Sequence, residues 1–170
     1  MSIHIERGEI ETSSAGLGVA TLRRRATGRL GDLGLWVVLF LVLAIFTGSD
    51  APDGERAYPG WFYPSLALLP ITYEAAAVRW WKGQTWGKSW AGTRVATLSG
   101  GTPSLTRSII RAAMTWPFLA VATNDQLGPW IQIPAIAFYI MVFAVALTNR
   151  RHRGLHDLAA ATIVIRAPLT

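Results

Sequence analysis

Long apolar runs separated by short polar segments constrain this chain more than any other feature. Residues 29–47 form a 19-residue apolar run. As an α-helix this run is about 28 Å long, which matches the hydrocarbon core of a bilayer. Comparable runs cover residues 61–81, 107–123 and 130–148. We therefore expect an all-α membrane fold, a bundle of about four transmembrane helices joined by short loops.

The composition agrees with a lipid environment. Hydrophobic residues make up 51% of the 170 residues and charged residues only 15%, which is typical of a membrane protein. The net charge of +6 lies mainly beside the apolar runs, so we expect anionic headgroups of the lipid bilayer as its partner and no nucleic acid. The absence of Cys excludes disulfides, thiolate metal sites and Cys nucleophiles.

The distribution of Lys and Arg predicts the topology. Five of these residues lie in the segment up to Arg29, five in 82–111 and four after 149, whereas 48–60 holds only Arg56. Because cytoplasmic loops are enriched in Lys and Arg, we expect a multi-pass protein of the cell membrane with both termini and the loop 82–106 in the cytoplasm. Arg111 and Pro117 interrupt the third run, so a three-span or re-entrant arrangement is the alternative.

The expected domain organisation is simple. Residues 1–22 are expected to form a cytoplasmic tail, 23–166 the transmembrane domain and 167–170 a short C-terminal tail. The apolar region begins only after Arg23, Arg24 and Arg25 and no small-residue cleavage site ends it, so we do not expect a secretory signal peptide.

Asp32 is out of place in the first expected helix. A carboxylate inside a spanning helix costs about 2.5 to 3.5 kcal/mol on insertion scales. Arg29 precedes Asp32 by three residues and Arg25 by seven, so both lie near its face of the helix. Asp32 is then either a structural group neutralised by Arg29 or Arg25, or an ion or proton site that faces the interior of the bundle.

Glu74 is the second carboxylate in an expected span, about two turns before its cytoplasmic end. Its structural interpretation is an ion pair or hydrogen bond with Arg79, Lys82 or a donor from the loop. Its functional interpretation is a proton relay.

The loop from Gly83 to Val95 is polar, basic and rich in glycine. Its G-x-x-x-G-K-S segment has one residue too few between the glycines for a phosphate-binding P-loop, and it follows a helix, not a strand. Gly87 and Gly92 permit close backbone approach. Trp86 and Trp90 are expected to anchor a short cytoplasmic interfacial helix, and Lys88 and Arg94 to reach phosphates. We also expect a short two-stranded β pairing of 93–98 with 162–165.

The segment after the last apolar run contains His156 and Asp157. A metal-dependent phosphohydrolase would need further His and Asp ligands, and the other histidines are only His4 and His152; no metal and no cofactor are expected. Asp157 is expected to accept from Arg or backbone N–H groups of the central loop, or to lie at the mouth of a polar path. Without a nucleophile elbow or a dinucleotide fingerprint, we do not expect an enzyme.

Three separated blocks together resemble the RDD family of small integral membrane proteins. Arg25-x-x-Gly28-x-x-x-Asp32 is similar to the Arg…Asp pattern of the family's first helix, with Gly where Ala is more usual. Residues 83–88 and 92–95 resemble its G-x-T-x-G-K…G-x-R-V loop. Residues 153–162 resemble its terminal R-G-x-H-D-x-x-A-x-T block, with Ala161 where Gly is common.

The resemblance implies a membrane location, and a role in transport has been proposed for the family, with some members associated with sodium–proton exchange. On this hypothesis Asp32 is the exchanging carboxylate, Asp157 a second acidic group, Arg25 the cation that tunes it and Glu74 a relay. The ligands would be Na⁺ and H⁺, and the chain is expected to act as a homo-oligomer because four short spans enclose little volume.

The alternative is a non-transporting membrane protein, an assembly or regulatory partner. Its motif residues would then hold the cytoplasmic cap together in one polar cluster with Asp157; they are Gly83, Thr85, Gly87, Lys88, Gly92, Arg94 and His156.

Overall fold

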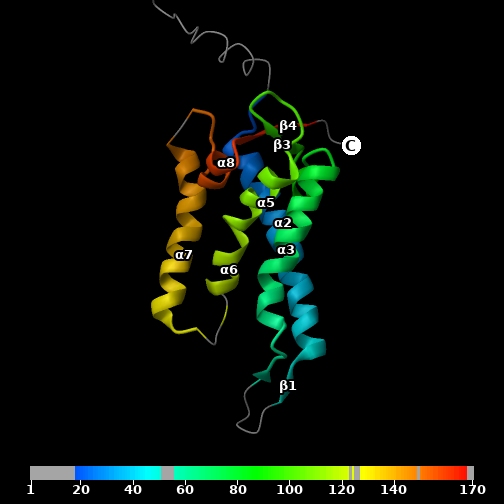
Figure 1. Ribbon diagram of the computed structural model, residues 1–170, viewed down its shortest axis with the longest axis vertical. Coiled ribbons are helices and arrows are strands. Elements are labelled where there is room, and N and C mark those ends of the chain that lie inside the picture. The colour runs from blue at the N-terminus through cyan, green and yellow to red at the C-terminus, as the bar shows by residue number, and fades with distance from the viewer. Residues whose placement is uncertain (1–17, 51–55, 123, 125–126, 149, 168–170) are drawn as a thin grey trace, which may run out of the picture.

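The computed structural model describes residues 18–50, 56–122, 124, 127–148 and 150–167. It is an elongated, mostly helical molecule whose helices run along its long axis (Figure 1). Most of the expected N-terminal tail, the acidic part of the loop at 51–55 and the last three residues lie outside the described residues.

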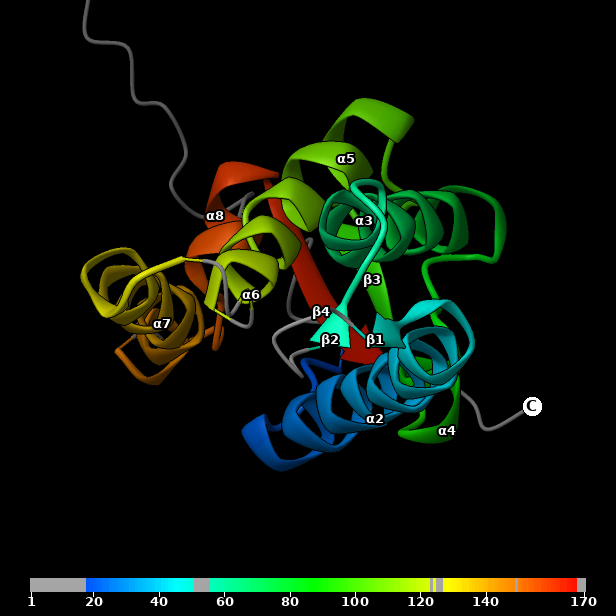
Figure 2. The same cartoon turned by 90° about the horizontal axis from the view of Figure 1, so that it is seen from below.

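Four helical segments build the body of the molecule. They are α2 (Leu22–Thr47), α3 (Phe62–Trp80), the pair α5 (Leu105–Ala113) and α6 (Trp116–Ala122), and α7 (Pro129–Ala144), which continues as the 3₁₀ turn η1 (Val145–Leu147). α3 packs against α5 and α6, and α6 packs against α7. Seen along the axis in Figure 2, α7 and α2 lie on two different sides of this group.

One end of the molecule is closed by a small compact unit, which we call the cap. It consists of α4 (Trp86–Trp90), β3 (Thr93–Thr97), α8 (Leu155–Ala159) and β4 (Thr162–Arg166). β3 and β4 pair antiparallel with Val95 opposite Val164, which confirms the two-stranded pairing expected from the sequence. Their β-branched side chains pack with Ala20 and Val78 into a buried core.

Both ends of the described chain lie at the cap. The backbone N–H of Arg166 donates to the Gly18 carbonyl over 2.7 Å, and Val19 bridges to Ile165. The opposite end of the molecule carries the hairpin of β1 (Ser49–Asp50) and β2 (Arg56–Ala57), which joins α2 to α3.

The surface of the helical body is strongly apolar. Among the described residues, two helices are long and apolar enough to cross a membrane, residues Leu22–Thr47 and Pro129–Leu147. Large side chains on them face outward, including Phe46, which is 83% exposed, and Trp130, which is 88% exposed. Contiguous apolar surface of this kind marks contact with a membrane or another protein.

Two helix boundaries differ from the sequence expectation. The first helix begins at Leu22, not at 29, because the Thr21 hydroxyl accepts from the N–H of Arg24 and caps it. The third apolar run is two helices, broken at Met114 and Thr115. Pro117 explains the break, because proline has no N–H and its ring excludes a helical carbonyl four residues earlier.

Candidate functional site

Close contact between α2 and α4 creates the first part of a buried polar site. A Cβ placed on Gly87 would lie 2.2 Å from the Gly28 carbonyl oxygen, so only glycine fits there. This approach lets the N–H of Gly87 donate to Asp32 Oδ1 over 2.8 Å. Thr85, the N-cap of α4, donates its hydroxyl to Asp32 Oδ2 over 2.6 Å. Asp32 is only 2% exposed.

Lys88 lies at the centre of this site. Its Nζ donates to Asp32 Oδ2 at 3.1 Å, to Glu74 Oε1 at 3.2 Å and to Thr85 Oγ1 at 3.1 Å. The three oxygens come from α2, α3 and the start of α4. A buried ammonium group is thus surrounded by oxygen atoms from three parts of the chain.

Glu74 connects Lys88 to the other helices. Its Oε2 accepts from Trp116 Nε1 at 2.7 Å and from Arg29 Nη1 at 3.0 Å. Arg111 Nε lies 3.5 Å from its Oε1. Glu74 therefore draws α2, α4, α5 and α6 towards α3, and every one of these charged groups is mostly buried.

Asp157 forms a second centre, joined to the first through Arg111. It is fully buried and forms ion pairs with Arg25 and Arg111. The N–H of Gly154 donates to its Oδ2 over 3.2 Å, and the Thr162 hydroxyl lies 3.4 Å from its Oδ1. The continuous network now spans the cap and four helices.

The network carries more positive than negative charge. Three carboxylates, Asp32, Glu74 and Asp157, face four cations, Arg25, Arg29, Lys88 and Arg111. His156 lies beside them but does not add to the excess, because burial, with a further contribution from Arg111, holds its pKa well below the usual value of 6.5.

The expected partners of Asp32 were wrong. Among the described residues neither Arg29 nor Arg25 forms an ion pair with it; Lys88 does. The glycine contact brings the start of α4 onto Asp32, while the long side chains of Arg29 and Arg25 reach past it to Glu74 and Asp157. Spacing along one helix could not reveal these longer-range pairings.

Two further expectations need correction, and a third is confirmed in part. Lys88 does not reach outward to phosphates, because it is 6% exposed and paired with carboxylates. For Glu74, the expected donor from the loop is confirmed and is Lys88, whereas the alternatives Arg79 and Lys82 are exposed. Asp157 does accept from Arg, but from α2 and α5 and not from the central loop.

The remaining motif residues shape the loop around the network. Gly83 and Gly92 have positive φ of 84° and 61°, and a Cβ on Gly83 would lie 2.1 Å from the Val95 carbonyl oxygen. Arg94 donates to the Gly100 carbonyl at 3.4 Å, and it forms no ion pair with the described residues of the network. His156 packs its ring against Phe143.

The comparison with known families covers every charged residue of this network. The model of the RDD family matches residues 19–161, a range that includes all three carboxylates and all four cations. The chain belongs to the RDD family. No curated protein and no solved structure matches it. RDD membership, together with the two apolar helices, indicates a membrane protein.

Sequence reasoning missed Arg111 and Trp116 as members of the site in this RDD protein, and it paired Arg29 with Asp32 instead of Glu74. Arg29 and Trp116 both contact Glu74, and the Arg29 guanidinium lies 4.2 Å from the centre of the Trp116 ring. The sequence could have indicated Arg111, because it lies inside an apolar run, where a charged residue without a partner is costly.

Proposed function

We propose that this RDD protein exchanges a small cation such as Na⁺ for a proton across the cell membrane. The observation that carries the proposal is the oxygen cage around Lys88, formed by Asp32, Glu74 and Thr85 within 3.2 Å of its Nζ. Oxygen atoms, carboxylates above all, are the ligands that hard cations prefer. The Lys88 ammonium group occupies the position that such a cation would take.

The exchange step needs only this cage and water. Lys88 as an ammonium ion holds the oxygens while no metal ion is bound. When Na⁺ enters, the ammonium group gives its proton to water. The neutral amine then no longer pairs with the two carboxylates, which bind the ion. One positive charge enters as one proton departs, so the charge of the site is unchanged. The resemblance to the RDD family implied that Asp32 carries the proton. In this proposal Lys88 carries it, and Asp32 is the cation ligand.

The proposed topology has four spans with both termini in the cytoplasm. Its support is the distribution of exposed cations. Arg23, Arg24, Lys82, Arg107 and Arg166 are exposed on the elements that lead into the cap, whereas the β1–β2 end carries only Arg56. An excess of Lys and Arg marks the cytoplasmic side. Since one chain encloses little volume, we propose a homo-oligomer as the working form.

The test is proton flux in vesicles that contain the purified protein, driven by gradients of sodium, lithium or potassium. Wild type is expected to show cation-driven flux, and Asp32→Asn to reduce it to the level of empty vesicles. Asp50→Asn is the matched control, because Asp50 is an exposed residue of β1, and it is expected to keep the flux. Full flux from Asp32→Asn would contradict the proposal.

A second candidate is a non-transporting protein in which the network only fastens the cap to the helices. The observation in its favour is that each oxygen of the three carboxylates already accepts a hydrogen bond or ion pair. On this account, folded Asp32→Asn protein and wild type show equal flux at background level, and the variants differ only in stability.

A further inference from the structure

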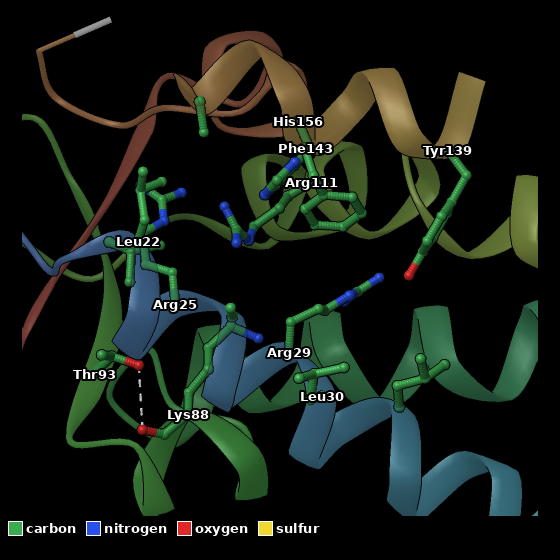
Figure 3. A pocket seen from close by; sticks show the side chains of 14 residues that line it. Leu22, Arg25, Arg29, Leu30, Lys88, Thr93, Arg111, Tyr139, Phe143 and His156 are labelled. Atoms are coloured by element: carbon green, nitrogen blue, oxygen red, sulfur yellow. Dashed lines mark hydrogen bonds between the residues drawn. The ribbon is translucent and has the colours of Figure 1, made fainter. Parts of the chain in front are cut away.

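A pocket of about 360 Å³ lies between α2 and α7 beside the buried network. Four cations line it: Arg25 and Arg29 from α2, Lys88 from α4 and Arg111 from α5. They surround the same space, with Arg29 extending towards Tyr139 of α7 and Arg111 beside Phe143 (Figure 3). None of the described carboxylates that pair with these cations belongs to the lining. The wall therefore presents four cations and no carboxylate among the described residues, together with apolar side chains and the neutral polar groups of Thr93, Tyr139 and His156.

The pocket also contains hydrogen-bond donors without an acceptor. Arg29 uses Nη1 on Glu74 and also interacts with the Tyr139 hydroxyl, but its buried Nε and Nη2 have no acceptor within hydrogen-bond geometry among the described residues. A buried hydrogen-bond donor without an acceptor lowers folding stability by about 1 to 3 kcal/mol, and by more when the donor is charged. An oxyanion would satisfy a guanidinium in this state, since its oxygens match the two N–H groups of the fork.

Part of the lining is apolar, and this part leads to a second cleft. Leu30 and Leu33 line the cationic pocket next to Arg29. Leu33 also lines a cleft of about 470 Å³ whose other lining residues, among them Trp36, Val37 and Leu41, are apolar or aromatic. Val37 and Leu41 are exposed. An acyl chain could therefore extend from the cationic pocket along α2 without leaving apolar surface.

The depth of the pocket fits a lipid. From Leu30 to the end of α2 at Thr47, the helix rises about 27 Å, the thickness of the hydrocarbon core. Arg25 and Arg29 precede this stretch and so lie at the level of the headgroups. Basic pockets between helices on the cytoplasmic side are suited to lipid headgroups.

We propose that this pocket binds the phosphate of an anionic membrane lipid, with Arg29 as its main hydrogen-bond donor and an acyl chain along Leu30 and Leu33. Binding offsets the excess positive charge of the network and fills the space between α2 and α7. This goes beyond cation exchange and does not depend on it.

The test measures binding to the purified full-length protein in detergent, from the shift of its thermal unfolding midpoint with ligand concentration. The probes are phosphatidic acid, phosphatidylcholine with the same acyl chains, and inorganic phosphate. Both lipids carry a phosphate, but only phosphatidylcholine also brings a choline cation towards the four cations of the lining. Wild type is therefore expected to bind phosphatidic acid at least about tenfold more tightly than phosphatidylcholine. Equal affinity for the two lipids would overturn the proposal, and inorganic phosphate that binds as tightly as phosphatidic acid would overturn the assignment to a lipid.

A pair of charge-matched variants locates the site. Ala26 is exposed and lines the pocket, whereas its neighbour Thr27 is exposed and does not. Ala26→Glu is expected to abolish the preference for phosphatidic acid, and Thr27→Glu to keep it. A preference retained in Ala26→Glu would contradict the location.

Arg29→Lys is a second variant that keeps the positive charge near Glu74. Because lysine lacks the two parallel donors of arginine, it is expected to weaken binding of phosphatidic acid by about tenfold. Unchanged affinity would show that the Arg29 fork does not hold the phosphate.

Discussion

Among single residues, Asp157 is expected to contribute strongly to stability, because it is fully buried and forms ion pairs with both Arg25 and Arg111. Asp157→Asn leaves Arg25 without its carboxylate and leaves Arg111 with Glu74 alone. Loss of one member of a buried ion pair typically costs about 3 to 5 kcal/mol. We expect a large drop in the thermal unfolding midpoint in detergent. Asp50→Asn, at an exposed position, is the control and should change stability by less than about 0.5 kcal/mol.

The outcome for Asp157→Asn also separates the two functional accounts. If the protein folds with unchanged stability and yet loses cation-driven proton flux, Asp157 acts in transport. If stability falls and the folded fraction retains its flux, Asp157 only fastens α8 to α2 and α5.

His156 should make stability depend on pH. Its pKa is lowered in the folded state, mainly by burial and next by Arg111. Below about pH 6.5 the unfolded chain therefore binds a proton at His156 that the folded protein does not bind. Stability therefore falls as the pH decreases from that value. His156→Gln removes this contribution and should flatten the decline between about pH 6.5 and 5. Unfolding midpoints of both proteins across this range check it, and parallel curves would contradict it.

The sequence identified the charged residues of the site better than their contacts. Asp32, Glu74 and Asp157 stand out because carboxylates are costly in apolar surroundings. Their partners could not be predicted, because Lys88 meets Asp32 only after α4 packs on α2, and Arg111 meets Asp157 across 46 positions of the chain. Local spacing carries no information on contacts of that range.

At the level of elements, the contact of α4 with α2 determines the site. Gly87→Ala would place a Cβ 2.2 Å from the Gly28 carbonyl oxygen and 2.8 Å from Asp32 Oδ1, so α4 must move away and the Asp32–Lys88 pair must lengthen. We expect a loss of several kcal/mol, as for overpacked cores. Gly34→Ala on α2 is the control, since its Cβ meets nothing within 4 Å, and it should be neutral or stabilising. Equal unfolding midpoints for the two variants would contradict this role.

The elements themselves were predictable to different degrees. Apolar runs indicated α2, α3 and α7, and β-branched residues indicated β3 and β4. The split of the third run into α5 and α6 was only hinted at by Pro117. Periodicity shows where a helix can form, but the break depends on the backbone around one proline.

At the level of the whole molecule, the cap and the β1–β2 hairpin form opposite ends (Figure 1), and the proposed topology places them on opposite sides of the membrane. Because the chain has no Cys, single-cysteine labelling is free of background. Ser49→Cys at the hairpin and Ser99→Cys beside the cap are both exposed. In intact cells a membrane-impermeant maleimide should label only the first. Labelling of both residues, or of Ser99→Cys alone, would contradict the topology.

The most direct test of cation exchange at Lys88 is proton release on cation binding. NaCl is added to the purified protein in weakly buffered solution, and the released protons are counted against bound sodium. Wild type should release about one proton per sodium bound, because the ammonium group loses its proton as the ion enters the cage. Lys88→Gln should release none, and Lys82→Gln, at an exposed lysine, should behave as wild type. Sodium binding to wild type without proton release, or no sodium binding to the folded protein, would contradict the proposal.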